Sequence, residues 1–362
     1  MDNIEAIWDD KAIHWIKRIL TAKTVKGKEY YYIRMSFDFR IPGHKRGFTR
    51  ELYVCPKSTQ DKELKYQFCL AERKFMRETY QFLLSASNEY KTLLLKPNEK
   101  KELEKIRVAY NVLLKGFGDP DPKRYEESMF TRYVYGTTSI EGNTYTLRET
   151  SLILNEGITV GGKDKREFYE IENYGRLKKE LPSPNKIKID LDLVNLIHRI
   201  IMAHIDDDSA GEFRRVDVGI RGAEFSPPLS FEVEKKMKGL MKWYAEHEQK
   251  MHPVELATIF HQKFTEIHPF VDGNGRVARE LVRQIFAMNG YPTIFIDRSS
   301  REEYLKSLDE GNKGNYKPLA DFFVNNLVNV HHQLLDRAKS SMDSKSDVLD
   351  CKKCTVAKKC GR

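Results

Sequence analysis

The chain alternates between two kinds of hydrophobic pattern. Between residues 29 and 55, apolar and polar side chains alternate with a period of two, which predicts half-buried β-strands. One face of the first strand carries Tyr31, Ile33, Met35, Phe37 and Phe39. Pro42 and Gly43 mark a turn, so residues 48–54 are expected to return as a second strand.

From about residue 59 to residue 115 the chain is rich in Lys, Glu and Leu, which predicts long helices with charge pairs four residues apart. The segment "GFGDPDP" at residues 116–122 interrupts any regular element. After it the pattern is almost entirely helical. Helix starts are predicted by a capping box at Thr146 and Glu149, by an apolar periodic stretch from Asp190, and by Pro253.

These patterns predict a mainly α protein in three parts. An α+β N-terminal domain is expected at residues 1–115, a helical domain at 116–335, and a polar tail with a cysteine cluster at 336–362. Residues 216–228 have hairpin character between helices.

Composition fits a soluble globular protein, since 40% of the residues are hydrophobic and 32% are charged. No apolar run approaches the ~20 residues of a spanning helix. The N-terminus carries acids where a signal peptide would carry lysines. We therefore expect a cytoplasmic protein without a membrane partner. The net charge is +9, but basic and acidic residues are interleaved, so charge alone does not favour nucleic acid as a partner.

The five cysteines are expected to be reduced thiols rather than a disulfide framework. Three of them, Cys351, Cys354 and Cys360, lie near the C-terminus, and the first two have the spacing of half a zinc site. A fourth ligand is not evident. Two interpretations of this segment stay open: a zinc site, or a basic tail without metal.

The densest chemistry lies in "IHPFVDGNGRVARELV", residues 267–282. His268 is expected at a helix end, because Pro269 disfavours helix in the residue before it. Gly273, Asn274 and Gly275 allow left-handed backbone angles and converging N–H groups. The next helix, expected from about Arg276, adds its positive end, so loop and helix together predict an anion site.

The side chains around this turn suit a polyphosphate. Arg276 and Arg279 lie on one helix face, and guanidinium groups match phosphate oxygens. Asp272 provides a carboxylate for Mg²⁺, and His268 provides a base with a pKa near neutrality. An anion site, a metal ligand and a base together indicate phosphoryl-type transfer.

The segment "HPFVDGNGRVAR", residues 268–279, resembles the Fic-family signature His-x-Phe-x-Asp/Glu-Gly-Asn-Gly-Arg-x-x-Arg at every defined position. The resemblance covers roughly residues 120–335, including "GEFR" at 211–214, but neither the N-terminal strands nor the cysteine tail. It implies a Fic-type helical bundle core with a small β-hairpin flap. It also implies transfer of AMP from ATP to a Ser, Thr or Tyr hydroxyl of a protein, which can be the chain itself.

The resemblance also implies a role for each residue of the motif. His268 would be the base, Asp272 would hold Mg²⁺ on the phosphates, and Phe270, beside Pro269, would pack inward. The anion hole and the phosphate contacts would come from Gly273, Asn274, Gly275, Arg276 and Arg279. Gly275 favours AMP transfer over the kinase-like Doc branch, which has lysine there, while other nucleotides and phosphocholine stay open.

A second segment, "GTTSIEGNTYTL" at residues 136–147, resembles the inhibitory motif of the family, Ser/Thr-x-x-x-Glu followed by Gly or Asn. Thr137 and Glu141 match it. The resemblance places Glu141 at the end of an inhibitory helix around residues 123–142 and pairs it with Arg279, in the γ-phosphate site. In some relatives the same glutamate helps to remove AMP, so a brake and a hydrolytic residue are both open. Without the resemblance, Glu141 is only a glutamate before a glycine.

The hairpin-like segment at residues 216–228 matches the position of the target-docking flap of the family. Val218, Gly219 and Ile220 would then register the target by strand addition; a plain surface connection is the alternative. The resemblance also allows a homodimer. A different class of function stays open as well: a regulator that grips nucleic acid or a protein through its N-terminal strands and tail.

Overall fold

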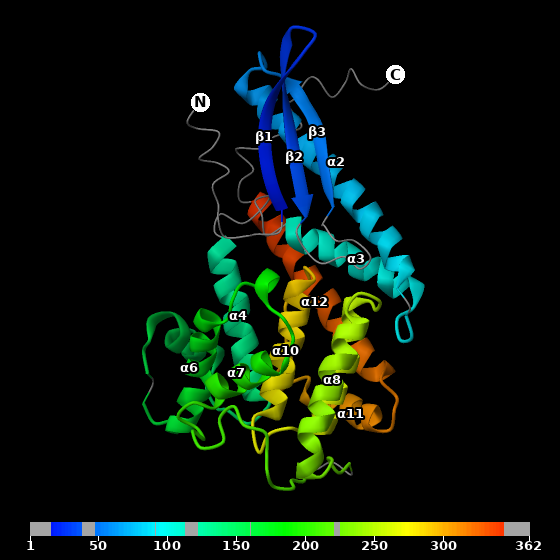
Figure 1. The fold of residues 1–362 in the computed structure, drawn as a ribbon. Helices are drawn as coiled ribbons and strands as arrows, with labels where there is room; N and C mark the ends of the chain where they lie inside the picture. The colour runs from blue at the N-terminus through cyan, green and yellow to red at the C-terminus, as the bar shows by residue number, and fades with distance from the viewer. Residues whose placement is uncertain are drawn as a thin grey trace.

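The computed structural model describes residues 16–37, 48–90, 92–112, 122–159, 161–220 and 225–343. In these ranges the chain is mainly helical, with one antiparallel sheet near the N-terminus, which confirms the expected fold class (Figure 1). No helix within them is long and apolar enough to cross a membrane.

The sheet has the order β1-β2-β3, with β1 at Ile16–Val25, β2 at Lys28–Phe37 and β3 at Thr49–Pro56. The strands β2 and β3 were predicted, whereas β1 was not. Lys26 and Gly27 both have positive φ, 50° and 75°, and they make the two-residue turn that pairs Val25 with Lys28. The turn expected at Pro42 and Gly43 lies outside the described residues.

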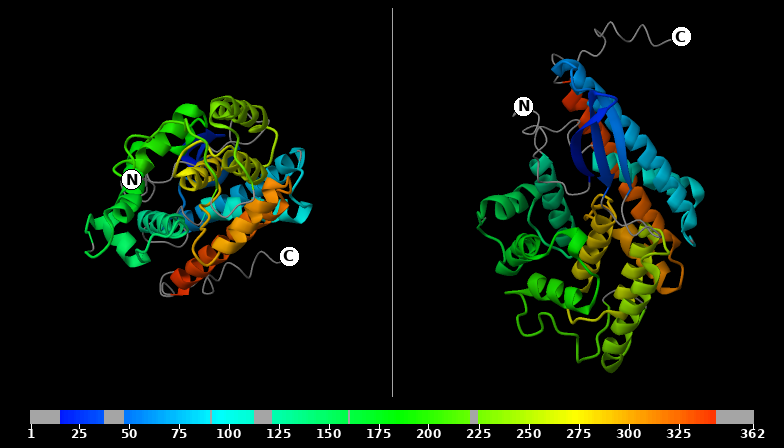
Figure 2. Two further views of the ribbon diagram at one scale, coloured as in Figure 1. Left: turned by 90° about the horizontal axis from the view of Figure 1, so that it is seen from below. Right: turned by 45° about the horizontal axis from the view of Figure 1, so that its top comes forward.

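The helix α2 (Asp61–Glu89) packs against β3, and α3 (Pro97–Val112) packs against both α2 and the long helix α12 (Lys317–Asp343). These helices confirm the expectation for residues 59–115 as far as the structure describes them. Between sheet and helix lies a core that includes Ile33, Met35, Leu52, Val54, Phe68 and Phe75. The right-hand view of Figure 2 shows the sheet in front of α2.

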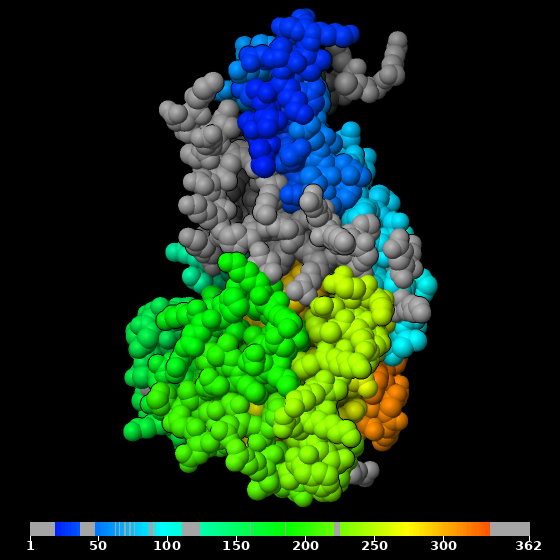
Figure 3. Space-filling model, in the orientation of Figure 1, coloured from blue at the N-terminus to red at the C-terminus, as the bar shows by residue number. Residues whose placement is uncertain are grey.

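A second, larger core fills the helical bundle. At its centre α9 (Pro253–Ile267) packs against α10 (Asn274–Met288). Around them lie α4 (Pro122–Ser139), α6 (Lys165–Glu180), α7 (Leu191–Met202), α8 (Val233–His247) and α11 (Arg301–Asn312). In Figure 3 this bundle, coloured green and yellow, lies below the blue N-terminal part.

The predicted helix starts are confirmed. The Asp190 carboxylate accepts a hydrogen bond from the Leu193 N–H at 3.0 Å, and Pro253 is the first residue of α9. Thr146 and Glu149 form the reciprocal capping box. The helix that this box begins, α5 (Leu147–Ser151), is short and continues as a π-helical turn at Leu152–Glu156.

The hairpin expected at residues 216–228 has no strand in its described part, residues 216–220 and 225–228. Two consecutive prolines, Pro227 and Pro228, lack the N–H groups that a ladder needs. The buried guanidinium of Arg214 holds the two ends instead, donating to the carbonyl oxygens of Val216 at 3.0 Å and Pro228 at 2.6 Å.

The cysteines of the tail, Cys351, Cys354 and Cys360, lie outside the described residues, so the zinc prediction stays a prediction. The buried Cys55 is a free thiol.

Candidate functional site

The loop that joins α9 to α10 is held in one conformation. His268 ends α9 with a left-handed backbone (φ 50°), and its N–H donates to the Phe264 carbonyl at 3.0 Å. Gly273, at φ 76°, precedes α10. The Asn274 carboxamide closes the loop, since it accepts from the Phe270 N–H at 2.9 Å and donates to the Phe270 carbonyl at 2.8 Å.

A histidine from α7, His198, packs against this loop; the sequence analysis did not identify it. The ring of His198 stacks on Phe270 with centroids 3.6 Å apart and planes 3° apart. Its Nδ1 accepts from the Gly211 N–H at 2.8 Å, so Nε2 carries the proton and donates to the Asp272 carbonyl at 3.1 Å. Burial lowers the pKa of His198 to about 4, which keeps the ring neutral.

His268 itself is the C-cap of α9, where the loop begins. Burial lowers the pKa of its imidazole below the ordinary value, and a backbone contact with Thr265 offsets part of that effect. The ring is therefore neutral at pH 7 and able to accept a proton.

Asp272 is an ionised carboxylate tied to the start of α10. Its Oδ1 accepts from the Gly273 N–H at 2.6 Å, and its Oδ2 lies 2.5 Å from Nη2 of Arg166 and 3.5 Å from Nη2 of Arg276. Burial alone would raise the pKa of Asp272, but Arg276, the Gly273 N–H and Arg166 outweigh it, so the pKa lies below its ordinary value. Arg166, from α6, was not predicted.

This carboxylate could hold Mg²⁺ together with ligands from a substrate. The described residues contain no group of three His, Cys, Asp or Glu side chains that could hold a metal ion. Mg²⁺ in nucleotide sites is commonly bound by one or two carboxylates plus phosphate oxygens. A single Asp272 beside an anion site fits that donor set.

Arg276 is buried beside this carboxylate. Its Nη1 lies 3.5 Å from Oε1 of Glu170 on α6, so the arginine bridges Asp272 and Glu170. The two carboxylates hold the cation at a helix N-terminus, where the dipole alone would disfavour it.

Arg279, one turn further along α10, is held by α4. Its Nη2 lies 2.6 Å from Oε1 of Glu141 and donates to the Thr137 carbonyl at 2.9 Å, and its Nε donates to the Thr137 hydroxyl at 2.7 Å. Burial would raise the pKa of Glu141, but the charge and hydrogen bond of Arg279 outweigh it, and the pKa is lowered. The structure thus brings together Thr137, Glu141 and Arg279 from two distant segments.

Gly275 leaves the space that this ion pair uses. A methyl group at Gly275 would lie 2.8 Å from Oε1 of Glu141 and 2.9 Å from Nη1 of Arg279. Both are shorter than ordinary contacts, so one of the two side chains would have to move.

The turn that carries Glu141 is fixed by residues that the sequence did not single out. Arg301 donates to the Ile140 carbonyl at 3.0 Å, and Arg298 donates to the Asn143 carbonyl at 3.2 Å. The Asn143 amide in turn donates to Glu170 at 2.9 Å. In the sequence these two arginines are only basic residues near a helix start.

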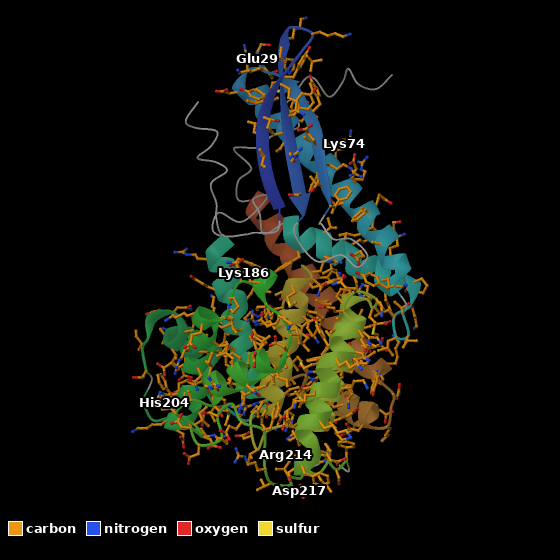
Figure 4. The ribbon with its side chains drawn as sticks, in the orientation of Figure 1. Glu29, Lys74, Lys186, His204, Arg214 and Asp217 are labelled. Carbon is orange, nitrogen blue, oxygen red and sulfur yellow. The ribbon has the colours of Figure 1, made fainter. Side chains whose placement is uncertain are left out.

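The expected flap begins beside the same loop. Besides the two flap carbonyls, Arg214 donates from Nε to the His268 carbonyl at 2.8 Å, and its N–H donates to the Pro269 carbonyl at 2.9 Å. Val218, Gly219 and Ile220 follow in an irregular, partly exposed segment. Figure 4 labels Arg214 and Asp217 at this end of the bundle.

The chain is similar to known proteins of one family. Residues 188–286 match the model of the Fic/DOC family. Curated relatives named protein adenylyltransferase Fic match as well: those of Drosophila sechellia and Drosophila virilis are 33% and 32% identical over 205 residues. These matches cover 56% of this chain but only 41% and 42% of the relatives' length.

Solved structures share the fold. A Fic domain-containing signalling protein from Bacteroides thetaiotaomicron has a TM-score of 0.59 at 24% identity, covering 66% of this chain and 98% of that one. A fragment of Fic-1 from C. elegans has a TM-score of 0.55 at 23% identity, covering 78% and 93%. The solved structures show the fold alone, and the family model, which includes the motif, identifies residues 188–286 as a Fic/DOC domain.

Proposed function

We propose that the protein is an adenylyltransferase that moves AMP from ATP to a Ser, Thr or Tyr hydroxyl of a protein and releases pyrophosphate. The observation that carries this proposal is the hydrogen-bonded loop from His268 to Asn274, in which a neutral histidine and an ionised carboxylate lie beside a helix N-terminus. The name shared by the curated relatives supports it.

In this mechanism His268 accepts the proton of the target hydroxyl while its oxygen attacks the α-phosphorus of ATP. The bond to the β-phosphate oxygen breaks, and pyrophosphate leaves. The backbone N–H groups from Gly273 onward and the positive end of α10 stabilise the negative charge that develops. Arg276 lies next to this position and contacts phosphate oxygens.

Asp272 would hold Mg²⁺, which when bound neutralises charge on the phosphates. For that, the guanidinium of Arg166 has to leave Oδ2, from which it is 2.5 Å away. The side chain of Arg166 is 51% exposed, so it can move into solvent at small cost.

We further propose that Glu141 is a brake. Arg279 is the cation expected on the γ-phosphate, and here its donors are taken by Glu141 and Thr137. A carboxylate in that position repels the phosphate and occupies its partner, so ATP cannot bind in the productive pose.

A second activity, removal of AMP from the modified protein, is favoured by the exposure of Glu141. Its side chain is 40% exposed, against 4% for that of Arg279, so a water molecule can reach Glu141 even though its Oε1 is bound to Arg279. The brake and the hydrolytic role use the same residue.

The experiment is intact-mass spectrometry after incubation with ATP and Mg²⁺. Three proteins are compared: the wild type, Glu141→Gly, and Glu141→Gly combined with His268→Ala. An AMP-sized gain only in the single variant supports transfer, brake and base together. A gain in the double variant would contradict the role of His268, and a greater gain in the wild type than in Glu141→Gly would contradict the brake.

If none of the three gains mass, each is incubated with a lysate and ATP labelled on the α-phosphate. Labelling of lysate proteins by Glu141→Gly alone supports transfer to another protein. Loss of existing AMP from lysate proteins in the wild type, but not in Glu141→Gly, supports removal. Absence of both would refute the proposed function.

A further inference from the structure

The positive charge of the chain is concentrated on the N-terminal sheet. Residues 16–37 and 48–57 contain eight Lys and Arg residues and two Glu residues, a net charge of about +6 of the total +9. The basic residues are interleaved with acids along the whole sequence, but strand pairing brings most of the excess into one small unit.

One face of this sheet is apolar and covered, and the other is basic and aromatic. Ile33 and Met35 on β2 are buried in the core that the sheet shares with α2. The alternating residues of the same strand, Tyr30, Tyr32 and Arg34, point to the opposite face. There Tyr32 is paired with Tyr53 on β3 and with Thr21 on β1.

The tyrosines of this face form a cluster edged by cations. The Tyr53 ring lies 5.8 Å from that of Tyr32, at 76°, and 5.9 Å from that of Tyr30, at 56°. The ammonium group of Lys23 lies 5.1 Å from the centre of the Tyr32 ring and is paired with Glu51, whose Oε2 is 2.5 Å away, so the free positive charge of this face comes from Arg34 and Lys28. Tyr53 is 52% exposed, and Arg34 and Lys28 are exposed as well.

We propose that this face binds double-stranded DNA by lying in its major groove. Two neighbouring strands of this sheet, about 4.8 Å apart, form a two-stranded ribbon, which the major groove, about 12 Å wide, admits. Strands of 10 residues are about 33 Å long, close to one turn of the duplex. Lys and Arg side chains contact phosphates, and tyrosine hydroxyls can donate to the same oxygens.

The tilted rings favour duplex DNA over single strands. Single-stranded nucleic acid binds where aromatic rings present open faces for successive bases. Here the rings stand at 56° and 76° to one another, so the edge of one ring covers part of its neighbour's face. Exposed Lys and Arg side chains beside rings whose faces are partly covered suit a phosphate backbone better than stacked bases.

This surface is separate from the proposed active site. Glu29 labels the sheet at one end of the molecule in Figure 4, and Arg214 labels the catalytic end at the other. Duplex DNA on the sheet leaves the motif loop open, so the inference does not depend on the proposed transferase activity.

The test is fluorescence anisotropy of the full chain with a labelled mixed-sequence duplex of about 24 base pairs, from about 50 to 300 mM NaCl. The variant Lys28→Ala/Arg34→Ala removes two positive charges from the sheet. The control Lys242→Ala/Lys306→Ala removes two charges from helices of the bundle, where these side chains are 79% and 73% exposed. Thermal unfolding of both variants checks that they remain folded.

We expect the sheet variant to weaken duplex binding by about tenfold or more near 100 mM salt, and to reduce the salt slope by about 2. The control should stay within about twofold of the wild type. Equal losses in the two variants, or no duplex binding near 50 mM salt, would overturn the proposal. Tighter binding of the matching single strand would overturn it in favour of a stacking site. Binding of an acidic polypeptide such as polyglutamate as tightly as the duplex would overturn it in favour of a protein partner.

Discussion

The motif loop and the free face of the sheet both gather positive groups, but they are built in opposite ways. In the loop, the side chains of Arg276 and Arg279 are 3% and 4% exposed, and each is fixed by carboxylates within 3.5 Å. On the sheet, Lys28 and Arg34 project into solvent. A buried cation fixed by its neighbours binds only an anion placed in one geometry. Exposed cations attract any polyanion, and salt screens that attraction. Burial, more than charge, separates a catalytic site from a docking surface.

The largest effect is expected from removing His268, the proposed base, which has no counterpart on the sheet. In the Glu141→Gly background, His268→Ala should lower AMP transfer by about 10² to 10⁴-fold, because general-base catalysis contributes about that factor. Duplex binding by the sheet should not change. Transfer is measured by incorporation of label from α-phosphate-labelled ATP.

The pH dependence of transfer sharpens the same test. Because burial lowers the pKa of His268, the base stays neutral at pH values where an ordinary histidine is half protonated. The midpoint of the fall in rate on acidification, where His268 gains its proton, should lie below the ordinary histidine value of about 6.5. An inflection above that value would contradict the assignment of the base.

The next largest difference is expected in the free energy of unfolding when an aromatic residue of each region is replaced by alanine. Phe270 is fully buried under His198, so Phe270→Ala should lower the free energy of unfolding by about 3–5 kcal/mol. Tyr53→Ala, on the 52% exposed ring of the sheet, is the matched aromatic control and should cost less than about 1 kcal/mol. Urea unfolding measures both, and similar costs would mean that the face of the sheet is packed rather than free.

The smallest effect is expected at Arg166, the exposed residue that reaches into the buried loop. Arg166→Ala should free Asp272 and lower the Mg²⁺ concentration for half-maximal transfer by about two- to fivefold, since exposed ion pairs contribute at most about 1 kcal/mol. Arg176→Ala is the matched control, because Arg176 is also 51% exposed on α6 but pairs with Glu180. A higher Mg²⁺ requirement in Arg166→Ala would show that the arginine helps, rather than competes with, metal binding.

The sequence predicted the parts of the site that are encoded locally. The helix end at His268, the first residue of α9 and the next helix start all depend on residues within a few positions of one another; that helix was expected from about Arg276 and begins at Asn274. The family signature added Thr137 and Glu141, which no local rule would have linked to Arg279.

The residues that support the site were missed because their partners are far away in the sequence. His198 and Asp272 are 74 residues apart, and Arg166 and Asp272 are 106 apart. Before the fold is known, a histidine in an apolar helix and a surface arginine give no sign of these contacts. The strand β1 was missed for a local reason, since its alternation is weak and only the Lys26–Gly27 turn indicates a hairpin.

The pairing of Glu141 with Arg279 joins residues 138 positions apart in one chain, and this has a consequence for regulation. A tethered carboxylate has a fixed effective concentration at its partner, which dilution of the protein cannot change. A free inhibitor dissociates as its concentration falls, but this one stays until α4 moves or a competing anion displaces it. Inhibition should therefore be equally strong in a dilute and in a concentrated solution, unless contact between chains moves the helix.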